Sequence, residues 1–400
     1  MLHRDATRNG ILLAGAEVLA GGRAGDGAVL VRGRRIAALG REARRLARRD
    51  GARVVDLDGG YLAPGLIDLH THGAVGVDFV EASREEFARA MKHYVAHGVT
   101  SLLVSLYPSS WKRSLEVLER IASYLTDEVG GLVAFGIHLE GPFLSPHNPG
   151  ALPKRHFRPC STRDAARLLE AGRGTVKTVT VAPELQRSGE LIRFLRRRGV
   201  VPAFGHSCAD YETTRRALGQ GVQYVTHLFN AMTGMHHRAP GAVAALLEDP
   251  DVAVEIIGDG HHVDIPVLRL VHRSKPPDRV ILVSDSVHPC GLPAGRYQFA
   301  GDAVIVRGGR IQREDGTLAG SALTLDRALA IQVRRVGLPV DAAVKCCTAN
   351  PARAVGVERS RGRIARGRRA DLVLLDDRLR PQATWLAGEL VHARDRSRFA

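Results

Sequence analysis

The sequence predicts a (β/α)₈ barrel, also called a TIM barrel, with a small β-sandwich domain formed by the N- and C-terminal segments. Three observations predict this fold. Apolar runs alternate with amphipathic stretches between residues 65 and 284, as in repeated βα units. There are eight such runs, which is the strand number of this barrel. Both ends of the chain instead carry short alternating runs separated by glycine turns. We therefore expect the barrel over residues 63–358 and the two parts of the small domain over residues 1–62 and 359–400.

Each expected barrel strand is a short run rich in aliphatic and β-branched residues. In chain order the runs are GLIDL, VTSLLVSL, LVAFGIHL, VKTVTVA, VVPAFG, VQYVT, VAVEII and RVILVS. Nearly continuous apolar runs of this length are typical of strands that are buried on both faces. The longest helix-poor insertion, residues 288–320, lies between the eighth run and its helix.

The first helix of the barrel is indicated by its capping residues and its apolar period. Ser83 and Glu86 have the spacing of a capping box, in which each side chain accepts a hydrogen bond from the other residue's backbone N–H. Gly98 is suited to ending the helix. The apolar residues that repeat at helical spacing between these signals are Phe87, Ala90, Met91, Tyr94 and Val95.

The two ends of the chain read as strands of one small β domain. Residues 10–62 include GAVLVRGRRIAALG and ARVVDLDGGYLAPG, and residues 362–392 include GRIARGRRADLVLLD. These stretches alternate apolar and polar residues between glycine turns. We expect them to pair with each other across the length of the sequence.

Composition excludes several classes of protein. The chain has 400 residues, 44% of them hydrophobic, and a formal net charge of +15. The excess charge is mostly arginine without interleaved aromatic residues, so we expect no nucleic-acid partner, although the charge could steer an anionic small substrate. No apolar run approaches the ~18 residues that span a bilayer, and the N-terminus lacks the pattern of a signal peptide, so we expect no membrane association and a cytoplasmic location. The five cysteines are scattered and indicate reduced thiols.

Residues of metal-ligand type follow the strand runs, where the active site of such a barrel lies. The carboxyl ends of the eight strands share one rim, so side chains that follow different runs should meet there. These residues are His70 and His72 after the first run, Glu140 after the third, His206 after the fifth, His227 after the sixth, Asp259, His261 and His262 after the seventh, and Asp285 after the eighth.

Two groups among these residues have the chemistry of a metal site. Glu140, His206 and His227 provide one carboxylate and two imidazoles, a set that suits zinc or ferrous iron and leaves a position open for water. Asp285 could accept a proton from that water. His70 and His72 are two residues apart on a strand and therefore face the same side. This pair either holds a second metal or serves only as hydrogen-bonding residues.

Ten motifs in the sequence together resemble the N-acetylglucosamine-6-phosphate deacetylase family of the amidohydrolase superfamily. The resemblance extends from about residue 50 to residue 376, and HLEGPF with THLFNAM is its most specific part. The other motifs are PGLIDLHTHG, GHSCAD, HHRAPG, IGDGHHVD, VSDSV, LAGSALTLD, TANPARAVG and GRIARGRRADLVLLD. The motif HxH and the final ADLVLLD indicate only the superfamily.

The resemblance implies a role for each matching position. It implies that Glu140, His206 and His227 hold the catalytic metal and that Asp285 is the proton shuttle. The intact HxH pair further suggests a weaker second metal at His70 and His72, so we expect one or two divalent ions per chain, zinc or iron. The resemblance also implies a homodimer, because the phosphate-binding arginine can come from the neighbouring subunit. The implied substrate-binding residues are Ala151, Asn230, Ala231, Arg238 on the phosphate, His262 on the sugar phosphate, and the backbone at Leu318, Ala319 and Gly320.

The activity implied by the resemblance is metal-dependent removal of the acetyl group from N-acetylglucosamine 6-phosphate, a step of amino-sugar catabolism. Two enzyme alternatives stay open, namely the same reaction on N-acetylgalactosamine 6-phosphate and another amidohydrolase reaction such as cyclic-amide hydrolysis. A catalytically silent barrel that binds sugar phosphate and regulates a partner is a third alternative, which the complete ligand set disfavours.

One position departs from the pattern of the resembling family. Where that family has His or Gln after GPFLSP and a short turn, this sequence has Leu152. The group that contacts the acyl carbonyl or a sugar hydroxyl is therefore not identified. His147 and His156 are nearby alternatives.

Overall fold

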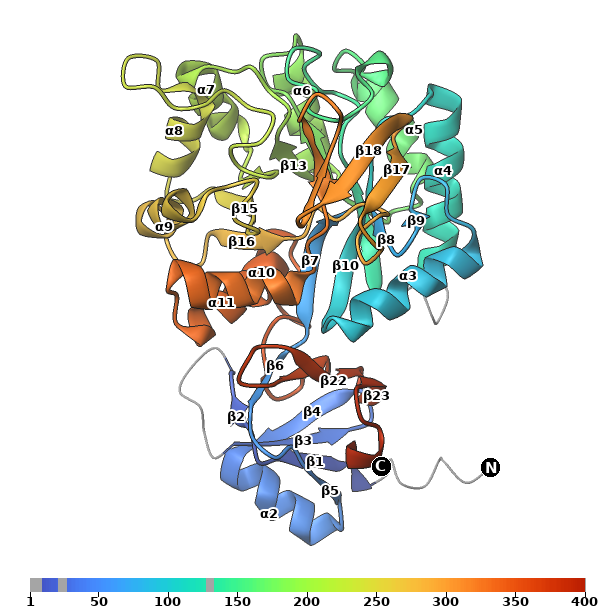
Figure 1. Cartoon of the computed structure of the whole chain (residues 1–400), viewed down its shortest axis with the longest axis vertical. Helices are drawn as coiled ribbons and strands as arrows, with labels where there is room; N and C mark the ends of the chain where they lie inside the picture. Colours follow the sequence, from blue (N-terminus) through green and yellow to red (C-terminus); the bar gives the residue numbers. More distant parts are fainter. Residues whose placement is uncertain (1–8, 21–26, 127–132, 400) are drawn as a thin grey trace. The chain divides into compact units, whose positions relative to one another are not determined.

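The computed structural model describes residues 9–20, 27–126 and 133–399 (Figure 1). The chain divides into two compact units. One unit contains the segments Met1–Ile67, Lys92–Ser101 and Leu325–Ala400, and the other contains Asp68–Met91 and Leu102–Thr324. Parts of the expected N-terminal and C-terminal segments, residues 1–8, 21–26 and 400, lie outside the described residues. The domain boundaries that the sequence suggests stay predictions.

The second unit is built around a sheet of eight parallel strands within the described residues, as the eight runs predict. The sheet order β16-β15-β14-β13-β12-β11-β10-β7 follows the chain from one edge to the other. At the carboxyl ends of the first and last strands, the backbone N–H of Asp285 donates to the carbonyl of His70, and the N–H of His72 donates to that of Ser286. These bonds bring the first and last strands together at the carboxyl rim, so the (β/α)₈ prediction is confirmed. The strands are β7 (Leu66–Thr71), β10 (Val99–Leu106), β11 (Ala134–Leu139), β12 (Val176–Val181), β13 (Val201–Phe204), β14 (Tyr224–Val225), β15 (Ala253–Ile257) and β16 (Val280–Val283).

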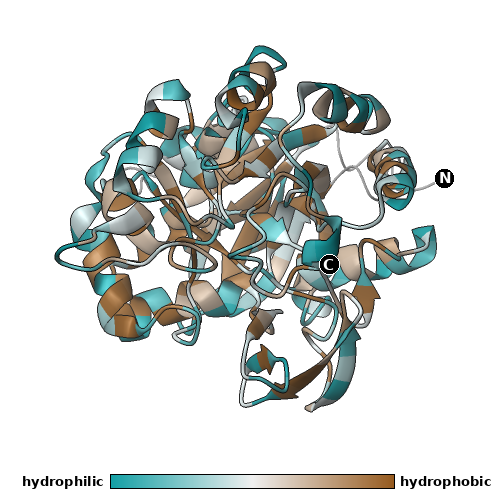
Figure 2. Cartoon of the chain, turned by 90° about the horizontal axis from the view of Figure 1, so that it is seen from above, coloured by the Kyte–Doolittle hydropathy of each residue, from teal (hydrophilic) through white to brown (hydrophobic). Residues whose placement is uncertain are grey.

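Helices follow the strands and surround the sheet (Figure 1). In α3 the capping box is confirmed, because the Ser83 N–H donates to Glu86 Oε2 at 2.9 Å and the Glu86 N–H donates to Ser83 Oγ at 3.2 Å. Hydrophobic residues gather on the central strands, while the helices turn hydrophilic sides outward (Figure 2). The helices are α3 (Arg84–Ala96), α4 (Trp111–Leu125), α5 (Thr162–Ala171), α6 (Ser188–Arg197), α7 (Tyr211–Gln220), α8 (Gly241–Glu248) and α9 (Ile265–Ser274). In the described part of the chain no helix has the length and hydropathy needed to cross a bilayer.

The insertion after the eighth strand is an antiparallel meander. Strands β17 (Gly295–Phe299), β18 (Asp302–Arg307), β19 (Arg310–Gln312) and β20 (Leu318–Ser321) pair in that order. Its apolar side packs into a small cluster with Ala151, Val287 and Phe299. The meander thus brings residues far along the chain to the carboxyl rim of the barrel.

The first unit contains a two-sheet sandwich formed by both ends of the chain, as expected. Strand β6 (Tyr61–Pro64) pairs antiparallel with β21, so that Leu62 faces Leu374. The two sheets have the orders β4-β3-β1-β5 and β2-β6-β21-β22-β23, and one apolar cluster includes residues of both, such as Val31 and Trp385. The remaining strands are β1 (Ile11–Ala14), β2 (Glu17–Val18), β3 (Ala28–Arg32), β4 (Arg35–Leu39), β5 (Arg53–Asp56), β21 (Leu372–Leu375), β22 (Pro381–Leu386) and β23 (Glu389–Ala393).

This unit also contains helices, one of which the sequence interpretation missed. Helix α2 (Gly40–Asp50) lies in an N-terminal segment that was expected to hold strands only. Ala43 and Ala47 are the buried residues of α2, and they pack against Leu30 of the neighbouring sheet. Ala43, Leu46 and Ala47 recur at helical spacing between arginines, so the sequence did carry the pattern of an amphipathic helix, which the strand interpretation of this segment overlooked. Three further helices of the unit are α10 (Leu325–Ile331), α11 (Val340–Cys346) and α12 (Ala349–Ala354).

Candidate functional site

The predicted ligands lie where the barrel strands end, on backbone that is itself unusual. His206, His227 and Asp285 follow β13, β14 and β16, and their φ angles are +48°, +32° and +48°. Non-glycine residues rarely adopt this left-handed conformation, which is often found at functional sites. The preceding Gly205 has no room for a side chain, because a Cβ there would lie 2.7 Å from Thr180 Cγ2. These turns aim the side chains inward over the end of the barrel.

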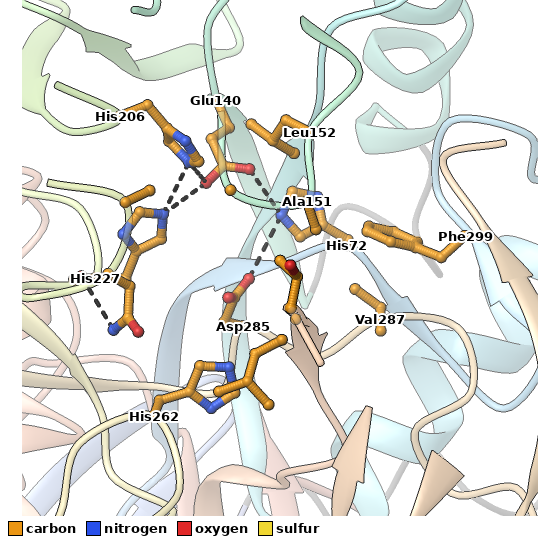
Figure 3. Close-up of a pocket in the computed structure, with 16 residues that line it drawn as sticks. His72, Glu140, Ala151, Leu152, His206, His227, His262, Asp285, Val287 and Phe299 are labelled. Atoms are coloured by element: carbon orange, nitrogen blue, oxygen red, sulfur yellow. Dashed lines mark hydrogen bonds and ion pairs between the residues drawn. The ribbon is translucent and has the colours of Figure 1, made fainter. Parts of the chain in front are cut away.

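Glu140, His206 and His227 form the first donor group. Glu140 Oε1 lies 3.1 Å from His206 Nε2 and 3.0 Å from His227 Nε2, and the two Nε2 atoms are 3.1 Å apart. All three side chains are buried. Figure 3 shows the two imidazoles and the carboxylate pointing at one another. The structure therefore brings together the three residues predicted as metal ligands.

His70, His72 and the carboxylate of Glu140 form the second donor group. Glu140 Oε2 lies 3.1 Å from His72 Nε2, and the Nε2 atoms of His70 and His72 are 3.2 Å apart. Both imidazoles are buried, His70 completely. The carboxylate of Glu140 thus lies between the two groups, because Oε2 faces His72 while Oε1 faces the first group and is also 3.4 Å from His70 Nε2.

Asp285 faces the second group. Its Oδ1 atom lies 3.4 Å from His70 Nε2 and 3.6 Å from His72 Nε2. Asp285 is 8% exposed and lines the same cavity as His72, so its carboxylate can reach a molecule in that cavity.

The donor groups fit a divalent cation. Two neutral imidazole nitrogens 3.1 Å apart can share only one hydrogen, whereas a cation accepts the lone pairs of both. The second ring nitrogens of two ligands have outer partners, as metal-binding histidines usually do: His206 Nδ1 is 3.2 Å from the Asn148 carbonyl and His70 Nδ1 is 3.0 Å from Glu255. For His72 and His227, the described residues provide no such partner to Nδ1.

The charge of the site also favours a cation. Burial opposes a positive charge on His70, but the carboxylates of Asp285 and Glu140 outweigh it and raise the pKa of His70 well above its ordinary value. Burial alone would raise the pKa of Glu140, yet the facing imidazoles lower it well below its ordinary value. Positive charge beside these buried carboxylates therefore stabilises the site, and a bound divalent ion would supply it.

A buried polar network lies beneath the second group. His138 packs edge-on against the ring of His70 with 4.6 Å between centroids. Its ring nitrogens lie 3.0 Å from Ser105 Oγ and 2.8 Å from Thr180 Oγ1. Burial and the nearby His70 lower the pKa of His138 well below its ordinary value, so this ring is neutral at physiological pH. The sequence interpretation did not find this residue, although it precedes Glu140 by two positions within HLEGPF.

A cavity of about 240 Å³ opens beside the donor groups. His206 and His227 lie on one side of it, whereas Leu152, Val287 and Phe299 lie on the other (Figure 3). The sequence analysis missed Phe299 and Thr317, because the meander that carries them has no metal-type motif. The lining residues are His72, Glu140, Gly150, Ala151, Leu152, His206, His227, Asn230, Ala231, His262, Asp285, Val287, Phe299, Thr317, Leu318 and Gly320.

Most of the predicted substrate-binding residues line this cavity, and two do not. His262 lines it with Nδ1 held 2.8 Å from Asp259 Oδ2. Ala319 is buried in the apolar cluster of the meander while its neighbours Leu318 and Gly320 face the cavity. Arg238 is exposed and does not line the cavity, and its Nη1 lies 2.7 Å from His237 Nε2.

The structure locates the position that departed from the expected pattern. Leu152 is 7% exposed and lines the cavity next to Ala151. The nearby alternatives His147 and His156 are not among the lining residues, and His147 is exposed. The wall at this position is therefore aliphatic.

Comparisons with known proteins agree on one family. The profile of the amidohydrolase family matches residues 61–391. N-acetylglucosamine-6-phosphate deacetylase of Homo sapiens is 37% identical over 358 residues, which cover 86% of this chain and 86% of that protein. N-acetylgalactosamine-6-phosphate deacetylase of Escherichia coli O157:H7 is 34% identical over 337 residues, which cover 84% of this chain and 89% of that protein.

A solved structure is similar over almost the whole chain. It is an aspartate-to-alanine mutant of N-acetyl-D-glucosamine-6-phosphate deacetylase from Mycobacterium smegmatis in complex with N-acetyl-D-glucosamine-6-phosphate. It matches with a TM-score of 0.87 and 34% identity and covers 96% of this chain and 99% of that chain.

Proposed function

The chain belongs to the amidohydrolase family, and we propose that it hydrolyses the acetamide of N-acetyl-D-glucosamine 6-phosphate to D-glucosamine 6-phosphate and acetate. The observation that carries this proposal is the pair of buried donor groups that share Glu140 and lie beside a cavity at the carboxyl rim of the barrel. Relatives named for this reaction, and a similar structure with this sugar phosphate bound, support the substrate.

Glu140, His206 and His227 would hold the catalytic metal, and His70 and His72 would hold a second one. Such an ion polarises a carbonyl oxygen and lowers the pKa of bound water. Zinc and iron are the ions we expect, since one carboxylate with imidazoles suits both.

Asp285 performs the proton transfers in this proposal. Water adds to the acetamide carbon, and Asp285 takes the proton that the water gives up. When the bond between that carbon and the nitrogen breaks, the same carboxyl group delivers the proton to the departing amine. The products are acetate and the free amino sugar, so one residue acts first as base and then as acid. Its position on the cavity wall, beside the second donor group, supports this role.

Different walls of the cavity would contact different parts of the substrate. Asn230, Ala231, His262 and the backbone around Leu318 to Gly320 would contact the sugar phosphate. The aliphatic side at Leu152 and Val287 offers no hydrogen-bond donor and would face an apolar part of the substrate, such as the acetyl methyl group.

A panel of acetylated sugars tests the proposed function. Purified protein of known metal content is incubated with N-acetylglucosamine and N-acetylgalactosamine, each with and without the 6-phosphate, and acetate release is measured. We expect the highest kcat/KM for N-acetylglucosamine 6-phosphate. The similarity to the Escherichia coli protein makes the galactosamine isomer the second candidate, and a preference for it would replace our substrate. No acetate from any of the four compounds would contradict the proposal.

We expect Arg238 of one subunit to bind the phosphate group of the substrate in the active site of the other subunit of a homodimer. Its exposure outside the cavity of its own chain is compatible with a contact in trans. Arg238→Ala should raise KM for the phosphorylated sugar far more than for the unphosphorylated one, because only the phosphate makes the charge-assisted contact. Arg215→Ala, on the surface of α7, is the control. Equal effects on both sugars would remove the phosphate role.

Mixed dimers distinguish a contact in trans from one within a chain. Arg238→Ala and Asp285→Asn chains are co-expressed with different tags, and the mixed dimer is isolated. If Arg238 acts in trans, one of the two active sites of the mixed dimer is complete and has wild-type KM. If Arg238 acts within its own chain, no complete site forms. A protein that is monomeric in sedimentation would contradict the homodimer. The cytoplasmic location stays a prediction.

The two-metal arrangement is tested at His70 and His72. Replacing both residues with Gln should lower the metal content from near two toward one ion per chain and leave measurable deacetylation, because the first donor group keeps its three ligands. Elemental analysis of the purified protein gives the stoichiometry. His236→Gln/His237→Gln, which changes two exposed adjacent histidines, is the matched control. Unchanged metal content in the His70/His72 variant would mean that this pair only forms hydrogen bonds.

A further inference from the structure

A buried carboxylate, that of Glu255, contacts residues of both donor groups. Glu255 is on β15 and is 0% exposed. Its Oε2 atom lies 3.0 Å from His70 Nδ1 and also accepts a hydrogen bond of 3.1 Å from the backbone N–H of His227. Its Oε1 atom accepts a hydrogen bond from the Tyr224 hydroxyl. One side chain therefore contacts a histidine of each group, one through the ring and the other through the backbone.

The ring contact decides which nitrogen of His70 faces the donor group. A carboxylate beside Nδ1 favours a hydrogen on that nitrogen, and the Nε2 lone pair is then directed at His72 and Glu140. The ring is also fixed against rotation, because His138 packs against it edge-on. Without the carboxylate, the other tautomer would place a hydrogen where a metal must bind.

The backbone contact acts on the turn that carries His227. This residue has a φ of +32°, which is unfavourable for a residue with a side chain. Its N–H would be an unsatisfied buried donor without Glu255. The hydrogen bond therefore offsets part of the cost of the conformation that aims the imidazole at Glu140.

The partners of Glu255 belong to one connected network. A buried carboxyl group needs polar partners, and Glu255 has His70, the His227 N–H and the Tyr224 hydroxyl. Its contact with His70 has the order of a carboxylate–histidine–metal arrangement, in which the imidazole lies between the carboxylate and the ion.

We infer that Glu255 is a positioning residue that orients one metal ligand of each donor group, His70 through its ring and His227 through its backbone. The inference rests on the metal-binding role in the proposed function. Because the ring contact is direct, the second group should depend on Glu255 more strongly than the first. Tyr224 holds the far oxygen of the carboxylate and touches neither ligand in the contacts described, which makes it the matched control.

Zinc binding to the metal-free protein tests the inference without reference to activity. The full-length protein is stripped with a chelator, and Zn²⁺ is returned in competition with a chromophoric chelator, for wild type, Glu255→Gln and Tyr224→Phe. Glutamine preserves the shape, but its NH₂ group replaces one carboxylate oxygen, and its neutral carbonyl is a weaker acceptor for His70 Nδ1 and the His227 N–H. We expect Glu255→Gln to lose about 10–100-fold in Zn²⁺ affinity, the range known for outer partners of metal ligands, with the larger loss in the weaker binding step. Tyr224→Phe should remain within about threefold of wild type, since it keeps both contacts of Oε2.

The outcomes separate this inference from the proposed function. Wild-type Zn²⁺ affinity in Glu255→Gln, whatever its thermal stability, would overturn the inference, because a purely structural residue changes Tm and not affinity. Equal losses in both variants would overturn it too, since packing would then explain them. If Glu255→Gln does not fold, Glu255→Asp keeps the charge and shortens its reach, and the same loss is expected. A wild-type protein that binds Zn²⁺ in this Glu255-dependent manner but releases no acetate would contradict only the proposed function.

Discussion

Asp285→Asn is expected to lower kcat for acetate release by roughly 10²-fold or more while the fold and the bound metal are retained. The amide has the size of the carboxylate but cannot accept a proton from water. Both proposed proton transfers, from the water and to the amine, would therefore lack the group that performs them. Because each donor group keeps its three members when Asp285 is changed, the metal content should change little. The measurements are kcat and KM for N-acetylglucosamine 6-phosphate together with elemental analysis.

Asp341→Asn is the control for this variant. Asp341 is an exposed residue of α11 that pairs with Lys345, and such surface pairs contribute little. It should have wild-type kinetics. An Asp285→Asn protein within a few-fold of wild-type kcat would show that another group carries the proton. An inactive variant that has also lost its metal would instead make Asp285 a ligand.

Glu140→Gln should have the second large effect, and its cause is different. Glu140 belongs to both donor groups, so a single substitution removes the carboxylate that they share. An amide is a much weaker ligand for a divalent cation than a carboxylate. We expect the purified variant to contain well under one metal ion per chain. Loss of the ion removes several kcal/mol of transition-state stabilisation, which corresponds to roughly 10³-fold or more in kcat/KM.

Glu116→Gln, on the exposed side of α4, is the matched control and should keep both metal content and activity. Elemental analysis and acetate release are measured on the same preparations, and circular dichroism verifies the fold. Adding excess Zn²⁺ to Glu140→Gln should restore activity only in part. Full metal content in this variant would contradict the shared role of Glu140.

The strands and the first helix of the barrel were predictable because their signals are local. The eight apolar runs became the eight strands of one sheet, and the capping box of α3 formed as its spacing indicated. Helix α2 was missed although its signal is local too. Ala43, Leu46 and Ala47 repeat at helical spacing between arginines, but the flanking alternating runs favoured strands.

The composition of the donor groups was also predictable from the sequence. In a barrel of parallel strands, the residue after each strand reaches the same rim whatever its distance along the chain. For this reason Glu140, His206 and His227 could be placed together before their geometry was known. Arg238, which has no strand end to locate it, does not line the cavity of its own chain.

By itself, therefore, the sequence determined the strand count, the family and the residues that gather at the rim. The tertiary structure alone decided how those residues contact one another. It places the Glu140 carboxylate between both groups, it brings Glu255 against a histidine of each, and its meander brings Phe299 and Thr317 to the cavity. The physical reason is that hydrophobic period and capping act over a few residues, whereas a hydrogen bond between β7 and β15 depends on closure of the whole barrel. Glu255 is an example. In the run VAVEII it is only a polar residue inside an apolar strand, and its contact with His70 Nδ1 is visible only in the folded barrel.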